Sequence, residues 1–84
     1  MTSAAVEAVV IDVLKNVSRR PIEPAPDSDL VADLGFDSIQ VMETIAELED
    51  RLGISVPAAD VTETRTVAQV VARVTTLVAG RPEA

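Results

Sequence analysis

The sequence has no cysteine, histidine, tryptophan or tyrosine, and Phe36 is its only aromatic residue. Without cysteine, the chain has neither a disulfide framework nor a thiolate metal site. Without histidine, it lacks the side chain that enzymes use most often as a general acid or base. The remaining chemistry is that of carboxylates, hydroxyls and amides, and we therefore expect a protein that is not itself an enzyme.

Long apolar runs are missing as well. Residues 4–17 are rich in alanine and valine, but Glu7 and Asp12 interrupt them and no basic region precedes them, which argues against a signal peptide. No run approaches the roughly 20 apolar residues that span a membrane. The expectation is a cytoplasmic protein without membrane insertion, and its 84 residues are expected to form a single domain, 1–84.

Basic residues are scarce, and the formal net charge is −7. The window between Arg20 and Arg51 has no basic residue, and its acids include Asp27, Asp29, Asp33, Asp37, Glu43, Glu47, Glu49 and Asp50. Nucleic acid is a poor partner for such a surface, because binding there needs lysine and arginine. A protein with a basic patch fits well, although a solvated acidic face that only aids solubility stays an open alternative.

The first segment has apolar residues at helical spacing: Val6, Val9, Val10, Val13, Leu14 and Val17. This pattern predicts an amphipathic helix with a structural role. Ser3 is the expected N-cap, and Pro21 ends the helix by about Arg20.

Residues 21–36 read as a long loop with three prolines. Its apolar residues Leu30, Val31, Leu34 and Phe36 are expected to anchor it on the core. Asp27 and Asp29 lack the further ligands and the glycine that a calcium-binding loop needs, so no metal site is expected.

The second helix is predicted over Ser38 to Leu52, with Asp37 as its N-cap and Gln40 completing a capping box. Gly53 suits the left-handed residue that follows a helix. The expected inward row is Val41, Ile45, Leu48 and Leu52. A second apolar row of Ile39, Met42 and Ala46 lies beside the acids and suggests a docking strip, at least for Ile39 and Met42.

The last third predicts a short helix and a long one. Pro57 fits the first turn of a short helix over residues 58–61. Thr66 and Gln69 form a second capping box before the apolar face Val67, Val70, Val71, Val74, Leu77 and Val78, and Gly80 with Pro82 closes this helix. Residues 80–84 are expected to be a frayed tail. The fold expected is all-α, a small bundle of three long helices plus one short helix, with a long loop after the first helix.

Ser38 is the candidate functional residue. With Asp37 as the cap, its hydroxyl is free of capping and lies near the positive end of the helix dipole, where a covalently attached phosphate is favoured. The segment Leu34-Gly35-Phe36-Asp37-Ser38-Ile39, followed by Gly53-Ile54-Ser55-Val56-Pro57, resembles the acyl carrier proteins over nearly the whole chain. Gly35 offers the positive φ that a tight turn before the helix requires.

The resemblance implies that a phosphopantetheinyl transferase attaches 4′-phosphopantetheine from coenzyme A to Ser38. Acyl intermediates would then be carried as thioesters on this phosphopantetheine for fatty-acid, polyketide or related specialised biosynthesis. It also implies a short third helix that gates an acyl cavity, and partners of the acyl-transferring and ketosynthase types with basic docking patches. The residues expected to bind the transferase and other partners are Asp37, Ile39, Met42, Glu43, Glu47 and Asp50.

Two alternatives stay open on the sequence alone. Peptidyl or aminoacyl carriers are similar but usually have a second glycine where Phe36 stands. An unmodified acidic helical adaptor would use Ser38 merely as the first residue of a helix. Gln40 departs from the acid common in carriers of primary fatty-acid synthesis, which favours polyketide or other specialised synthesis. The short chain from Met1 suggests a free-standing, monomeric carrier.

Overall fold

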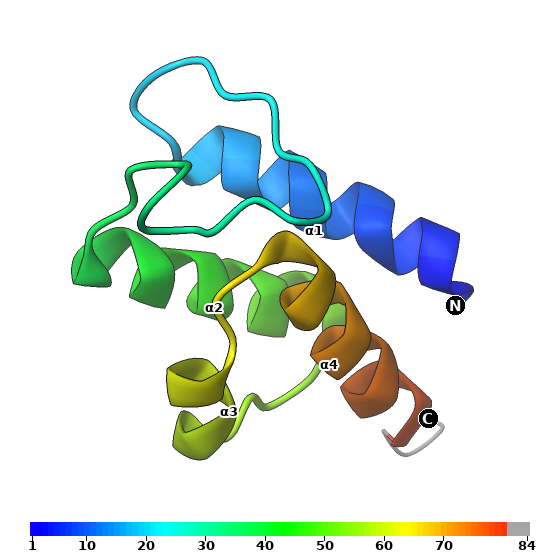
Figure 1. Ribbon diagram of the computed structural model, residues 1–84. Helices are drawn as coiled ribbons and strands as arrows, with labels where there is room; N and C mark the ends of the chain where they lie inside the picture. Colours follow the sequence, from blue (N-terminus) through cyan, green and yellow to red (C-terminus); the bar gives the residue numbers. More distant parts are fainter. Residues whose placement is uncertain (81–84) are drawn as a thin grey trace.

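The computed structural model describes residues 1–80, and Figure 1 shows their arrangement. Four helices form in the order α1 (Ser3–Val17), α2 (Ser38–Leu52), α3 (Ala58–Glu63) and α4 (Val67–Gly80). The described residues contain no strand, only an isolated antiparallel bridge between Asp29 and Thr66. The predicted all-α bundle of three long helices and one short one is confirmed.

The core lies where α1 packs against both α2 and α4. The three long helices and the loop between α1 and α2 each contribute buried apolar side chains, whereas α3 contributes none. The core residues are Val6, Val10, Val13, Leu14, Leu30, Leu34, Phe36, Leu48, Leu52, Ile54, Val67, Val70, Val71, Val74 and Val78. The apolar faces predicted for the first and last helices are confirmed, with Val9, Val17 and Leu77 packed partly buried at the edge.

Capping residues fix the helix starts. The expected cap of α1 was wrong by one residue: Thr2 is the cap, and its hydroxyl accepts from the backbone N–H of Ala5 at 3.1 Å. An N-cap oxygen must reach an N–H two or three residues on, and the extended backbone of Thr2 allows this while Ser3 is already helical. Thr66 and Gln69 form the predicted capping box before α4, through bonds of 3.2 and 3.1 Å.

The inward row of α2 differs from the prediction. Gln40 and Thr44 are buried together with Leu48 and Leu52, while Val41 and Ile45 are only half-buried. Local hydrogen bonds make this burial tolerable, because a buried polar atom costs little once it has a partner. The Gln40 side chain accepts from the backbone of Asp37, and the Thr44 hydroxyl donates to the backbone oxygen of Gln40 at 2.9 Å.

Buried apolar side chains and backbone hydrogen bonds hold the loop between α1 and α2 in place. Leu30, Leu34 and Phe36 are buried as expected, but Val31 is 61% exposed and does not anchor the loop. The carboxylate of Asp29 accepts from the backbone N–H groups of Val31 and Ala32, and the resulting turn leaves Val31 at the surface. Three backbone bonds join the loop to the start of α4: Leu30 N–H to Arg65 O, Val67 N–H to Ser28 O and Ala68 N–H to Pro26 O.

The short helix is longer than expected and weakly held. It runs over Ala58–Glu63, and Pro57 is its N-cap rather than part of its first turn. An ion pair of 3.4 Å between Arg73 and Asp60 joins it to α4. Gly80 is the last residue of α4, while Pro82 and most of the expected tail lie outside the described residues.

Residues 1–80 lack two further features. None of their helices combines the length and the apolar character needed to cross a membrane. They also hold no group of three or more acidic, histidine or cysteine side chains placed to bind a metal ion.

Candidate functional site

Ser38 is the first residue of α2 and is exposed. The Asp37 carboxylate accepts from the Gln40 backbone at 2.8 Å, and the Gln40 side chain accepts from the Asp37 backbone at 3.1 Å. This capping box was predicted and is confirmed. Because Asp37 does the capping, the Ser38 hydroxyl forms no hydrogen bond to any described residue and is available for chemistry.

The turn before Ser38 depends on Gly35, whose φ of +73° is in the left-handed region. The Arg20 guanidinium lies over this glycine and donates to the Leu34 carbonyl oxygen at 3.2 Å. A Cβ at residue 35 would come 2.6 Å from Nη2 of Arg20. Glycine therefore serves here for both its backbone conformation and the close approach of Arg20.

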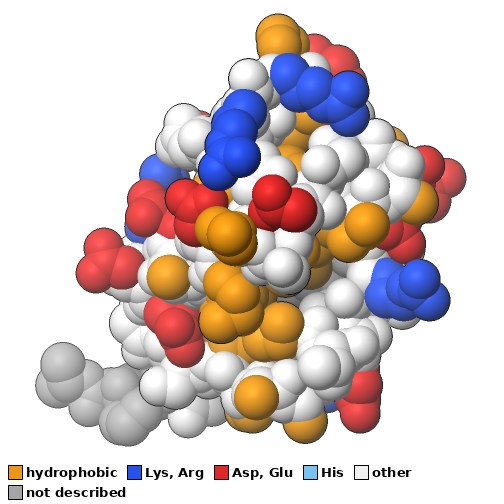
Figure 2. Space-filling view, turned by 90° about the vertical axis from the view of Figure 1, so that its left-hand side faces the viewer, with side chains coloured by type: hydrophobic (Ala, Val, Ile, Leu, Met, Phe, Trp, Pro, Cys, Tyr) orange, Lys and Arg blue, Asp and Glu red, His pale blue; other side chains and the backbone are white. Residues whose placement is uncertain are grey.

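A groove of about 420 Å³ opens beside Ser38. Its apolar walls come from the loop, α2 and α3, through Leu30, Val31, Phe36, Val41, Met42 and Val61. Figure 2 shows hydrophobic side chains gathered at the centre of the face on which α2 begins, with charged side chains around them. The volume lies in the range of small-molecule sites, so the groove offers apolar space next to a free hydroxyl.

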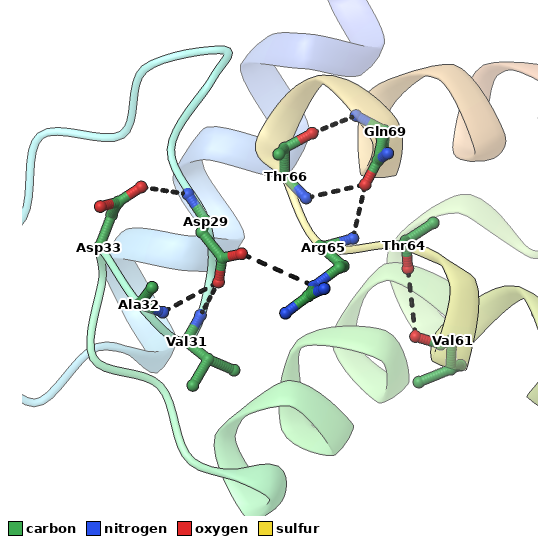
Figure 3. A network of polar contacts seen from close by, with 9 residues as sticks. All are labelled: Asp29, Val31, Ala32, Asp33, Val61, Thr64, Arg65, Thr66 and Gln69. Atoms are coloured by element: carbon green, nitrogen blue, oxygen red, sulfur yellow. Dashed lines mark hydrogen bonds and ion pairs between the residues drawn. The ribbon is translucent and has the colours of Figure 1, made fainter.

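Arg65 stands at the polar edge of this groove. Its side chain is 79% exposed, and its Nε lies 3.8 Å from the Asp29 carboxylate. Figure 3 marks this ion pair with a dashed line. The N–H groups of Ala32 and Val31 hold the pKa of Asp29 below its ordinary value, and the charge of Arg65 adds to this effect. The sequence alone does not reveal Arg65 as a site residue, because only the fold brings it to the groove.

The predicted docking strip is exposed. Ile39 and Met42 are 64% and 60% exposed on α2, and Ala46 is exposed too. The surface made by Ile39, Met42, Glu43, Glu47 and Asp50 is called the α2 face below.

The acids of the α2 face are not equivalent. Glu47 is paired with Arg51 at 3.1 Å, and Arg51 also reaches Asp12 on α1 at 2.7 Å. The hydrogen bonds that Arg51 donates to Asp12 and, to a smaller extent, to Glu47 raise the pKa of Arg51. Glu43 and Asp50 form no ion pair with any residue in the described range. The charge of Glu47 is therefore partly compensated within the protein, and those of Glu43 and Asp50 are not.

Comparison with known proteins places these features in a family. The family model described as "Phosphopantetheine attachment site" matches residues 5–74. The meromycolate extension acyl carrier protein of Mycobacterium tuberculosis is 32% identical over 100% of this chain and 74% of its own length. An acyl carrier protein of Streptomyces coelicolor is 35% identical over 94% of this chain and 92% of its own length.

Solved structures agree with these relatives. A structure described as an acyl carrier protein from Mycobacterium tuberculosis matches with a TM-score of 0.80 and 30% identity, over 84% of this chain and 96% of that one. The 3,7-dioxo-octyl form of the actinorhodin acyl carrier protein from Streptomyces coelicolor matches with a TM-score of 0.64 and 22% identity, over 93% and 91% of the two chains. The second match supports the fold alone.

Proposed function

This chain belongs to the acyl carrier protein family, whose members carry acyl groups on 4′-phosphopantetheine, and from this premise we propose that Ser38 is the residue to which the phosphopantetheine is attached. One observation carries the proposal: an exposed hydroxyl, free of hydrogen bonds to the described residues, stands at the first position of α2. Ser38 and Thr64 are the serine and threonine residues that line this groove, and of these two only Ser38 is at the first position of a helix.

The residues around Ser38 fit a phosphodiester. Asp37 orders the first turn of α2 through the capping box, and the N-terminal end of a helix favours an anion. When bound, the group supplies a thiol, which a chain without cysteine otherwise lacks. The protein itself holds, presents and orients the arm, and we propose that it catalyses no reaction.

Partner enzymes are expected to dock on the α2 face. Its exposed Ile39 and Met42 supply apolar contact, and Glu43 and Asp50 supply uncompensated negative charge. Complementary charge accelerates encounter and fixes orientation, so a phosphopantetheinyl transferase and acyl-transferring or ketosynthase-type enzymes with basic patches suit this surface. Asp37 lies at the end of the α2 face next to Ser38 and completes the transferase contact.

Residues 1–84 are proposed to act as one monomeric carrier domain. The proposed location is the cytoplasm, where coenzyme A supplies the arm. Relatives named for meromycolate extension point to fatty-acyl cargo, whereas Gln40 favours polyketide or other specialised synthesis. The cargo class proposed is therefore acyl groups of fatty-acid, polyketide or related pathways.

The attachment residue is tested by incubation with coenzyme A and a broad-specificity phosphopantetheinyl transferase, followed by intact mass measurement. We expect one added phosphopantetheine on the wild-type chain and none on Ser38→Ala. Ser28→Ala is the matched control and should be modified like the wild type. Addition to Ser38→Ala would show that the arm is attached to another residue. No addition to the wild type would contradict the carrier function and favour an unmodified acidic helical adaptor.

A further inference from the structure

Resting on the proposed function, we propose that Arg65 positions the chain tethered to Ser38 by donating hydrogen bonds to a carbonyl oxygen of that chain in the adjoining groove. Ser38 and Arg65 both line this groove of about 420 Å³. The arm begins at Ser38, so its nearest sheltered space is this groove. The acceptor is an amide carbonyl of the arm or an oxo group of its acyl cargo.

Arg65 has unused hydrogen-bonding capacity. A guanidinium carries five N–H donors, yet the closest approach to an acid is 3.8 Å, beyond the distance of a good hydrogen bond. Oδ1 of Asp29 accepts from two backbone N–H groups at 2.9 Å, and Oδ2 is the oxygen that lies 3.8 Å from Arg65. The Arg65 side chain therefore lies at the groove with N–H donors that form no hydrogen bond to a described residue.

The other polar side chains of the groove cannot donate a hydrogen bond to a carbonyl oxygen of the tethered chain. Asp29 and Asp37 are acceptors, and Ser38 loses its O–H proton when it is esterified. The Thr64 hydroxyl already donates to the Asp60 carbonyl at 2.9 Å. Among the described lining residues, Arg65 is thus the side chain with donors to spare for a carbonyl that enters between apolar walls.

Tethering makes a weak contact sufficient. A group linked to Ser38 meets the groove at a high effective concentration, on the order of millimolar for a short flexible linker. A single charge-assisted hydrogen bond next to apolar contact with Val31, Met42 and Val61 then shifts the arm from solvent into the groove. Acyl groups with oxygen near the thioester would gain more from Arg65 than plain alkyl groups.

The test uses the full chain loaded with coenzyme A, butyryl-coenzyme A or acetoacetyl-coenzyme A, with loading confirmed by intact mass. The readout is the NMR signal of the Arg65 side-chain Nε–H together with the methyl signals of Val31, Met42 and Val61. A shift of the Nε–H signal in every loaded form assigns the acceptor to the arm amides. A shift confined to the acetoacetyl form assigns it to the oxo group, since butyryl is a four-carbon group without that oxygen.

Arg65→Gln is expected to reduce the methyl shifts caused by loading about threefold or more, as loss of a charged donor predicts. Arg65→Lys should retain part of them, and Lys15→Gln, which removes one positive charge from the last turn of α1, should retain them fully. An Arg65 signal identical in unloaded and all loaded forms, or unchanged methyl shifts in Arg65→Gln, overturns the inference. A wild-type chain that takes no phosphopantetheine by mass overturns the proposed function instead.

Discussion

At the scale of single residues, the site is set by hydrogen bonds that reach only three or four positions along the chain. Asp37 and Gln40 bond each other's backbone and leave Ser38 free. The same logic places Thr66 and Gln69 before α4. If either cap moved by one residue along the chain, a different side chain would be at the first position of the helix. At α2 such a shift would take the Ser38 hydroxyl away from that position.

Gly35 and Gly53 have similar positive φ values, +73° and +62°, but different surroundings. We expect Gly53→Ala to lower the free energy of unfolding by about 1 kcal/mol, the cost of a Cβ in the left-handed region. Gly35→Ala should cost more, because its Cβ would push Arg20 from the Leu34 carbonyl. Urea unfolding measures both. Equal losses would show that Arg20 moves aside freely and that its bond to Leu34 contributes nothing.

At the scale of elements, α3 differs from the other helices because it has no buried residue. Its six residues are too few to be stable alone. The partly buried Val61 in the groove and the Asp60–Arg73 ion pair connect it to the rest of the fold. We therefore expect α3 to open locally at a free energy well below that of global unfolding.

Arg73→Gln tests how α3 is held. We expect faster amide hydrogen exchange in residues 58–63, with unchanged exchange in the core of α1 and α4. Global stability should change by about 1 kcal/mol, because Arg73 is 42% exposed to solvent although Asp60 is only 14% exposed. Arg73→Lys is the control, because it keeps the positive charge opposite Asp60. Unchanged exchange in α3 would mean that apolar contact, and not this ion pair, holds the helix.

At the scale of the whole molecule, the net charge of −7 is distributed unevenly by the fold. Arg51 joins α1 and α2 through Asp12 and Glu47 and compensates part of the α2 face. Arg20 and Arg65 come from outside the acidic window and lie in grooves that Asp37 also lines. The molecule therefore presents a mixed-charge site on an acidic body.

This distribution predicts unequal effects of the acids on docking. Glu43→Gln should lower kcat/KM for modification by a phosphopantetheinyl transferase several-fold at low salt, because an uncompensated charge steers association. Glu47→Gln removes the same charge but should have a smaller effect, since Arg51 already pairs with it. The difference should shrink as salt screens both charges. Equal losses, or a difference that persists at high salt, would contradict electrostatic steering by the α2 face.

The sequence by itself determined the helices, the caps of α2 and α4, and the candidate residue. Helical spacing identified the faces of α1 and α4, and the Asp37–Gln40 pair with Gly53 gave the bounds of α2, because these features depend on bonds between near neighbours. It also identified Ser38, since an accessible hydroxyl at a helix start follows from the cap alone.

Tertiary structure decided the rest. It buried Gln40 and Thr44 in place of Val41 and Ile45, turned Val31 outward, and brought Arg65 to the groove beside Ser38. It also paired Arg51 with Asp12, 39 positions away. Such contacts depend on how helices and loops pack, and packing joins residues whose separation along the chain carries no local pattern.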